Sequence, residues 1–257
     1  MRRVWGLGDY SPLSQVLEPA ARELADACAV SAGQEVLDVA AGDGNLAVAA
    51  AREGAAVVAS DISPGMVERG RRRAEAEGLE IEWVEADAED LPFEDARFDC
   101  AGSVFGAFLA PRPEVASREL FRVVRPGGTV GMATWAAEGY QAELFELNNR
   151  FFPRAEGVPP AIDWGREEVV RERFEGLAAS IELAPHSLEL GFASRDEMGE
   201  VLSRIPTFVA ARETLSDGDF AEYGDGLRAL VDRFNEAADG SVRIGCPYLV
   251  IVARKRG

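Results

Sequence analysis

The stretch E-V-L-D-V-A-A-G-D-G-N-L-A, residues 35–47, decides the fold that the sequence predicts. Residues 36–40 are apolar except for Asp38, which is typical of a parallel strand covered on both faces. Gly42 and Gly44 allow a sharp turn and a close approach of a ligand to the backbone, and Asn45 can cap a following helix. Such a strand, turn and helix start present free N–H groups at the carboxyl edge of a sheet, where α/β folds bind nucleotides.

The residues around this stretch alternate between the two types of element. Apolar runs predict strands at 56–59, 79–84, 98–104 and 129–135, and amphipathic or capped segments predict helices at 11–30, 45–53, 64–76 and 113–124. The arginine cluster at 69–73 is most simply a solvated helix face, paired in part with Glu68 and Glu75. This alternation predicts right-handed crossovers and a doubly wound sheet.

The regular alternation of predicted strands and helices ends at Ala136. Residues 137–176 look helical but irregular, 180–190 predict a sixth strand, 195–237 predict helices, and 243–254 predict a closing apolar strand. Pro247 inside that last strand indicates an edge position or a bulge, because proline has no N–H to donate. The expected fold is therefore α/β: a Rossmann-like, doubly wound, seven-stranded, mostly parallel sheet with a helical lid or insert after the fifth strand.

Composition narrows the class of protein. The chain has 257 residues, 47% of them hydrophobic, a net charge of −18, one histidine and three scattered cysteines. No apolar run approaches the ~18–20 residues of a membrane span, and Met-Arg-Arg leads into no signal core, so we expect a cytoplasmic protein. The acidic balance argues against nucleic acid as a partner. The cysteines suit neither a disulfide framework nor a metal cluster, so no metal site is predicted and buried thiols are expected.

Acidic side chains follow the first three predicted strands. Asp38 lies within the first strand, Asp61 ends the second, and Asp87 follows the third. Each has a structural interpretation: a buried acid bonded to loop amides, or a turn residue. Each also has a functional one, because a carboxylate at a strand end can accept the hydroxyls of a ribose or meet a base. Their occurrence at successive strand ends favours function.

Three functions fit these features. The turn G-D-G-N-L-A matches the G-x-G-x-x-A dinucleotide fingerprint, so a nicotinamide-dependent oxidoreductase is one candidate. It lacks a Tyr-x-x-x-Lys pair, since the only lysine is Lys255. The other two candidates, an enzyme and a non-catalytic binding protein, depend on the cofactor that a family resemblance implies.

The motifs V-L-D-V-A-A-G-D-G-N, V-A-S-D-I-S, E-A-D-A-E-D-L-P-F, F-D-C-A-G-S-V and L-F-R-V-V-R-P-G-G decide between these candidates. Together they resemble the class I S-adenosylmethionine-dependent methyltransferases of the small-molecule type, related to the ubiquinone and menaquinone methyltransferases. The resemblance covers residues 33–135 well. It implies one methyltransferase domain, 1–257, divided into an N-terminal arm and helix (1–32), a cofactor-binding core (33–135), a lid or insert on the acceptor side (136–179) and a C-terminal part (180–257).

The resemblance also implies cofactor-binding residues in five places. Around the glycine turn they are Asp38, Ala40, Ala41, Gly42 and Gly44, after the second strand Asp61, Ile62 and Met66, after the third Asp87 and Ala88, under the sulfonium Ser103, and on the N-terminal arm Tyr10. Asp61 would hold the ribose, Ile62 and Met66 would flank the adenine, and Asp87 and Ala88 would contact its edge. The family's D-x-G-x-G-x-G reads D-V-A-A-G-D-G here, so Ala40 replaces the first glycine, which we expect the turn to tolerate.

The expected reaction is an in-line transfer of a methyl group from S-adenosyl-L-methionine to a small, apolar or aromatic acceptor. Proximity and alignment would supply most of the catalysis. A base is needed only for a poorly acidic nucleophile. The single histidine, His186, is the one candidate, although a lone histidine in a strand is more often structural or exposed. The aromatic residues after the fourth and fifth strands are mostly expected to form lid core, with some lining an acceptor pocket. Oligomeric state and the atom that is methylated stay open.

Overall fold

The computed structural model of the chain describes residues 11–257. Its sheet has seven strands in the order β3-β2-β1-β4-β5-β7-β6. Strands β1 to β5 pair in parallel, whereas β7 is antiparallel to both of its neighbours. The strands are β1 Glu35–Val39, β2 Ala56–Asp61, β3 Ile81–Glu85, β4 Phe98–Val104, β5 Val124–Trp135, β6 Ala178–Phe192 and β7 Val242–Lys255. The predicted fold class is confirmed.

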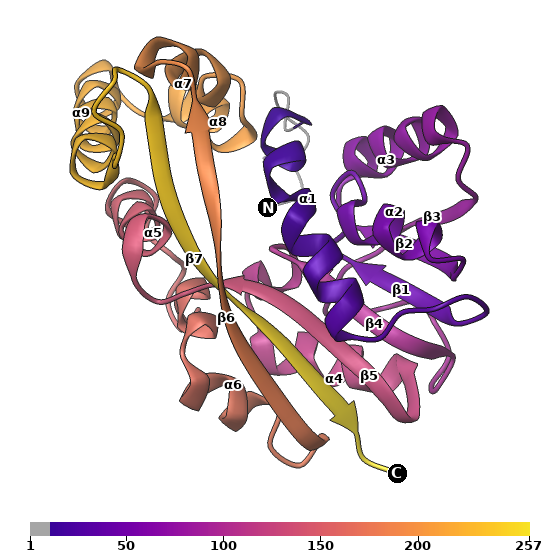
Figure 1. Cartoon of the computed structure of the whole chain (residues 1–257). Coiled ribbons are helices and arrows are strands. Elements are labelled where there is room, and N and C mark those ends of the chain that lie inside the picture. The colour runs from indigo at the N-terminus through magenta and orange to yellow at the C-terminus, as the bar shows by residue number, and fades with distance from the viewer. Residues whose placement is uncertain (1–10) are drawn as a thin grey trace.

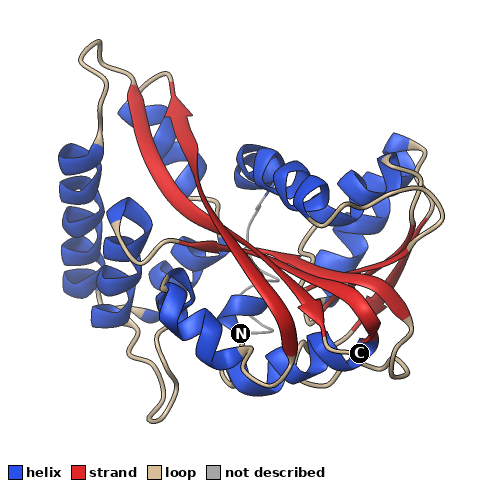
Figure 2. Cartoon of the chain, turned by 60° about the horizontal axis from the view of Figure 1, so that its bottom comes forward, coloured by secondary structure: helices blue, strands red, loops and turns tan. Residues whose placement is uncertain are grey.

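Helices cover both faces of the sheet. Helices α1, α2 and α3 pack on one face, and α4 with α6 packs on the other (Figures 1 and 2). The helices are α1 Ser11–Ala27, α2 Asn45–Arg52, α3 Pro64–Glu77, α4 Pro113–Val123, α5 Gly139–Phe151, α6 Glu167–Arg173, α7 Arg195–Leu202, α8 Pro206–Thr214 and α9 Asp217–Phe234, with short 3₁₀ turns η2 Ala107–Leu109 and η3 Ala161–Gly165. No helix within residues 11–257 has the length and hydropathy to cross a bilayer.

The core lies between these layers. In β1, Val36, Leu37 and Val39 are fully buried, as a strand covered on both faces requires. The three cysteines are buried free thiols, as predicted.

The second half of the chain forms a long antiparallel ribbon. The pairing of β5 with β7 ends at Trp135 and Tyr248, but β6 and β7 stay paired out to Phe192 and Val242. Helices α7, α8 and α9 are inserted between β6 and β7 at the far end of this ribbon, and α5 packs against α9 (Figure 1). The division of the chain into lid and C-terminal part stays a prediction.

The expectation that Pro247 marks a sheet edge or a bulge is wrong in one respect. Strand β7 is internal, and its pairing with β6 shows no register shift at Pro247, which lies opposite Ser187. The carbonyl of Pro247 accepts from the Ala136 N–H, just beyond the last β5–β7 pair. Because the N and C=O of one strand residue point the same way, the missing N–H of Pro247 faces the place where β5 has ended.

Candidate functional site

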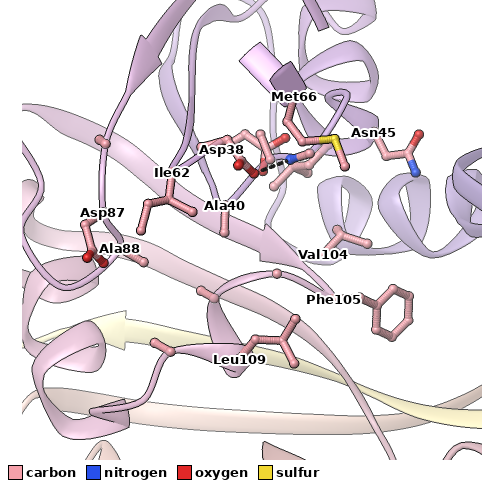
Figure 3. Close-up of a pocket in the computed structure, with 18 of the residues that line it drawn as sticks. Asp38, Ala40, Asn45, Ile62, Met66, Asp87, Ala88, Val104, Phe105 and Leu109 are labelled. Carbon is pink, nitrogen blue, oxygen red and sulfur yellow. Dashed lines mark hydrogen bonds between the residues drawn. The ribbon is translucent and has the colours of Figure 1, made fainter. Parts of the chain in front are cut away.

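A cavity of about 420 Å³ lies at the carboxyl ends of β1, β2, β3 and β4. Its volume falls within the range of about 300–1,000 Å³ that small-molecule sites occupy. Figure 3 shows Asp87 and Ala88 at one end, Asn45 and Phe105 toward the other, and Asp38 between them. Nine of the predicted residues line it: Asp38, Ala40, Ala41, Gly42, Asp61, Ile62, Met66, Asp87 and Ala88.

The turn after β1 is built from left-handed backbone. Ala40, Gly42 and Gly44 have φ of 52°, 59° and 91°. Gly44 is the N-cap of α2 and offers no capping side chain. An alanine held at positive φ costs roughly 1 kcal/mol relative to glycine, so the departure at Ala40 is a mild strain that the turn carries.

Asp38 replaces the missing cap and also faces the cavity. Its Oδ2 accepts from the Ala47 N–H at 2.9 Å, which is the third N–H of α2. Its Oδ1 is buried and has no hydrogen-bond partner among the described residues. Burial raises the pKa of Asp38 to about 8 against the lowering effect of the Ala47 amide, and the nearby Asp61 and Asp43 raise that pKa further. The structural and functional interpretations therefore apply to different oxygens of one carboxyl group.

Asp61 ties the first two turns together. Its Oδ2 accepts from the Gly42 N–H at 2.9 Å and its Oδ1 accepts from the Ser63 N–H at 2.8 Å. Burial raises the pKa of this carboxyl group, opposed by these two amides. Each oxygen keeps a second lone pair, so Asp61 can still accept hydroxyl donors from a ligand in the cavity.

The opposite wall follows β4. Phe105 has φ of 52°, which is strained for a bulky side chain. Its ring stacks on Trp135, with centroids 3.9 Å apart, and meets Tyr248 edge-on at 5.6 Å. A Cβ on the next residue, Gly106, would lie 2.2 Å from the Ala40 carbonyl oxygen. The close contact between the two turns therefore depends on the glycine at position 106, whereas position 40 carries an alanine.

Two of the predicted residues that the structure describes, Ser103 and Gly44, do not line the cavity. Ser103 is buried, and its hydroxyl accepts from the Ala107 N–H at 2.8 Å, which fixes the turn beneath the cavity. Gly44 is covered by Trp83, whose ring would be 2.7 Å from an added Cβ. Tyr10 lies outside the described residues. Gly44 and Ser103 thus support the residues that line the cavity without lining it themselves.

His186 lies away from the cavity lining. Its Nδ1 is 3.7 Å from Glu23 Oε2 on α1, and its ring stacks on Tyr248 at 5.4 Å. Of the aromatic residues expected around an acceptor, only Phe105 lines the cavity. Others pack in pairs, such as Phe108 with Phe145 and Trp164 with Phe174.

Sequence reasoning missed the polar wall formed by Asp43 and Asn45, which both line the cavity. The capping role predicted for Asn45 is wrong, since Gly44 holds the cap position. The Asn45 amide instead donates from Nδ2 to the Ser14 carbonyl at 2.9 Å. Its partner is 31 residues away, so no local pattern could reveal it.

The comparisons with known proteins agree with this geometry. The sequence profile of the family described as "Methyltransferase domain" matches residues 36–128. Two uncharacterized proteins of Mycobacterium tuberculosis are 39% identical over 171 residues and 38% over 199 residues, which are 66% and 76% of this chain. The alignments span 62% and 73% of those relatives. The demethylmenaquinone methyltransferase of Clavibacter sepedonicus is 46% identical over 104 residues, 40% of this chain and 42% of that one.

The chain belongs to the class I S-adenosylmethionine-dependent methyltransferases. Two solved methyltransferase-type structures show the same fold. A Bacillus halodurans protein assigned to the methyltransferases is 22% identical with a TM-score of 0.65, over 93% of this chain and 100% of that one. The Haemonchus contortus phosphoethanolamine N-methyltransferase 2, in complex with S-adenosyl-L-methionine, is 19% identical with a TM-score of 0.58, over 93% of this chain and 53% of that one.

The side chains present suit the methyltransferase cofactor, which carries an ammonium group and a sulfonium. All five titratable side chains among the described residues of the lining are carboxyl groups: Asp38, Asp43, Asp61, Asp87 and Glu89. The buried Oδ1 of Asp38, which has no partner among the described residues, costs folding free energy unless a hydrogen-bond donor reaches it. A cationic donor, such as the ammonium group of that cofactor, would satisfy it.

Proposed function

We propose that this protein transfers a methyl group from S-adenosyl-L-methionine to a small organic acceptor that is apolar or aromatic. The observation that carries the proposal is the unpartnered Oδ1 of Asp38, a residue that lines the cavity beside a left-handed turn in a chain of this family. A buried acceptor atom without a hydrogen-bond donor is rare in folded proteins. The ammonium group of a bound ligand would supply the donor that Asp38 Oδ1 lacks.

The placement of the other predicted residues supports one orientation of the cofactor. The turn at residues 40–44 and Asp38 would hold the methionine part. Asp61, in the middle of the cavity, would accept the ribose hydroxyls. Ile62 and Met66 would flank the adenine, with Asp87 and Ala88 at its edge. Asp87 Oδ1 already accepts from the Glu89 N–H at 2.9 Å, which holds this loop in place for a ligand.

The chemistry needs little from the protein beyond alignment. When bound, the cofactor supplies a methyl group activated by the positive charge of its sulfonium. The carboxylates of the lining stabilise that charge in the ground state, and the walls set the direction of approach. The described part of the lining contains no histidine, tyrosine, lysine or cysteine side chain. An acceptor whose nucleophile ionises readily by itself fits such a site best.

The acceptor would approach the wall made by Leu17, Val104, Phe105 and Leu109, all of which line the cavity. These side chains present only carbon, and Phe105 offers a flat ring edge against a planar ligand. The Clavibacter relative is, by its name, a methyltransferase that acts on demethylmenaquinone. That likeness supports a flat, apolar acceptor for this chain.

Binding and transfer test the proposal separately. Calorimetry with S-adenosylmethionine, S-adenosylhomocysteine and NAD should show binding of the first two and none of the third. NAD binding without the others would favour an oxidoreductase and overturn the proposal. Label from methyl-tritiated S-adenosylmethionine should then reach an organic product when phenols, hydroquinones and amines are offered. Cofactor binding without transfer to any acceptor would instead indicate the non-catalytic binding protein.

A further inference from the structure

We propose that Arg73 is a positioning residue that holds helix α1 and the cofactor turn together, and so sets the affinity for the amino-acid part of the cofactor. The inference rests on the proposed function for the identity of the ligand. Arg73 lies on α3 and does not line the cavity. It therefore acts through Asp43 and Asn45, which do.

The guanidinium of Arg73 joins three separate segments of the chain. Its Nη1 donates to Asn45 Oδ1 at 2.7 Å and lies 3.6 Å from Asp43 Oδ1. Asp43 lies in the turn after β1, and Asn45 is the first residue of α2. Its Nη2 donates to Glu18 Oε1 on α1 at 2.6 Å. Its Nε reaches Glu77 Oε1 on its own helix at 3.3 Å. The Arg73 side chain is only 17% exposed, so these contacts are shielded from water.

Ser14 forms a second tie between the same helix and turn. Its hydroxyl donates to Asp43 Oδ1 at 2.5 Å, and its carbonyl accepts from Asn45 Nδ2 at 2.9 Å. Ser14 is 1% exposed. One helical turn further along α1, Leu17 enters the lining of the cavity. Any loosening of the Arg73 contacts would therefore move α1 and the polar wall together.

Physical reasons make an arginine necessary at this place. The turn has three positive-φ residues, and besides the Asp38 and Asp61 carboxyl groups its conformation is held by contacts from α1 and α3. The acids Glu18, Asp43 and Glu77 surround one cation. A lysine would keep the charge but not the planar fork that reaches several acceptors at once.

The effect should be local to one end of the cavity. Figure 3 places Asn45 at the opposite side of the cavity from Asp87 and Ala88. Loss of Arg73 should therefore weaken the binding of ligands that fill the Asn45 end and spare ligands that do not. S-adenosylhomocysteine has the amino-acid part, and 5′-methylthioadenosine has the adenosyl group and sulfur without it.

Calorimetry with these two ligands on Arg73→Ala and Arg73→Lys tests the inference. Both variants should bind S-adenosylhomocysteine at least about tenfold more weakly, the loss expected for shielded charge-assisted hydrogen bonds. Both should bind 5′-methylthioadenosine within about twofold of the unsubstituted protein. Arg72→Ala is the matched control, because Arg72 is 70% exposed and its ion pair is with Glu68 on the same helix.

The outcomes are separable. Equal losses for both ligands would show a general structural role and overturn the inference, as would unchanged binding of S-adenosylhomocysteine. An Arg73→Lys variant that matches the unsubstituted protein would show that charge alone suffices, which also overturns it. If Arg73→Ala does not fold, Glu18→Ala removes the acceptor of one arm of the same contact. It should give the same ligand selectivity, with a smaller loss of affinity for S-adenosylhomocysteine. Failure of the unsubstituted protein to bind either ligand would refute the proposed function instead.

Discussion

The two halves of the sheet are built by different means. The parallel half, β1 to β4 with its turns, supplies nearly all of the described cavity lining from positive-φ backbone, carboxyl groups and small residues. The antiparallel half, β6 and β7 with helices α5 to α9, adds no side chain to that lining within residues 11–257. Its aromatic residues pair with one another instead, as Phe151 does with Tyr223 and Phe208 with Phe220.

The difference teaches where each property of the protein resides. The family profile ends at residue 128, before the ribbon begins, so the part of the chain shared with the family is the part that forms the cavity. The two halves meet at Phe105, which lines the cavity and stacks on Trp135 at the end of β5. Substitutions in the cavity lining or its supports in the first half should therefore change ligand binding, and those in the second half should leave it unchanged.

The largest effect is expected from Asp38→Asn. The asparagine keeps an acceptor for the Ala47 N–H but loses the charge opposite the ligand ammonium, so S-adenosylhomocysteine should bind about a hundredfold more weakly at pH 8.5. Stability should change little, because Asn resembles the protonated carboxyl group of the empty site. Calorimetry measures the affinity for S-adenosylhomocysteine, and urea unfolding measures the stability. Asp99→Asn, at the other end of the sheet in β4, is the control that should retain binding; unchanged affinity in Asp38→Asn would remove that residue from the site.

Gly106→Ala should be the next most damaging. The added Cβ would lie 2.2 Å from the Ala40 carbonyl oxygen, which is backbone and cannot rotate away. We expect about 2 kcal/mol less stability in urea unfolding, together with weaker binding of S-adenosylhomocysteine. Gly191→Ala, in the ribbon, is the matched control because its Cβ would meet only Glu189 Oε1 at 3.8 Å. Equal effects of the two substitutions would contradict the close contact between the turns.

Cofactor affinity should rise with pH. The pKa of Asp38 is raised to about 8 in the folded protein, mainly by burial, and lies near 3.9 in an unfolded chain. Folding therefore holds the proton more tightly, and the stability of the empty protein should fall as pH rises from about 4 to about 8. A cationic ligand needs the ionised form, so affinity should increase up to about tenfold per unit between pH 6 and 8 and then level off. Calorimetry across this range checks the slope, which should be smaller in Asp38→Asn.

Ala40→Gly should be slightly stabilising. Glycine removes the strain of a φ of 52°, which should raise the free energy of unfolding by about 1 kcal/mol. Glycine also makes the unfolded chain more flexible, which lowers that free energy and offsets part of the gain. Urea unfolding should show a net increase of about 0.5 kcal/mol with S-adenosylhomocysteine affinity retained. A clear loss of stability would mean that the Ala40 methyl group packs productively against the Gly106 turn.

His186→Gln should have the smallest effect. The ion pair with Glu23 is long, at 3.7 Å, and His186 is 31% exposed, so its loss should cost less than about 0.5 kcal/mol. Binding and methyl transfer should both stay unchanged. A fall in transfer with intact binding would instead make His186 the base that the sequence suggested.

The sequence predicted the elements far better than the contacts between them. The apolar runs located β1 and β4 closely, because a strand covered on both faces leaves a local signal. The roles of Asn45 and Arg73 were not predictable. Asn45 is a favoured capping type, and Arg73 sits in a cluster that suits a solvated face, yet the two bond to each other across 28 residues. Arg72, next to it, does behave as predicted and pairs with Glu68.

The insert of helices α7 to α9 leaves and re-enters the ribbon at one rung, since Phe192 and Val242 are directly paired. Neighbouring strands lie about 5 Å apart there, so a two-residue hairpin turn could bridge the same gap. Residues 193–241 therefore form an exchangeable module, whose removal leaves every described residue of the cavity lining in place. Other inserts could therefore be grafted onto this single rung without changing the described lining of the cavity.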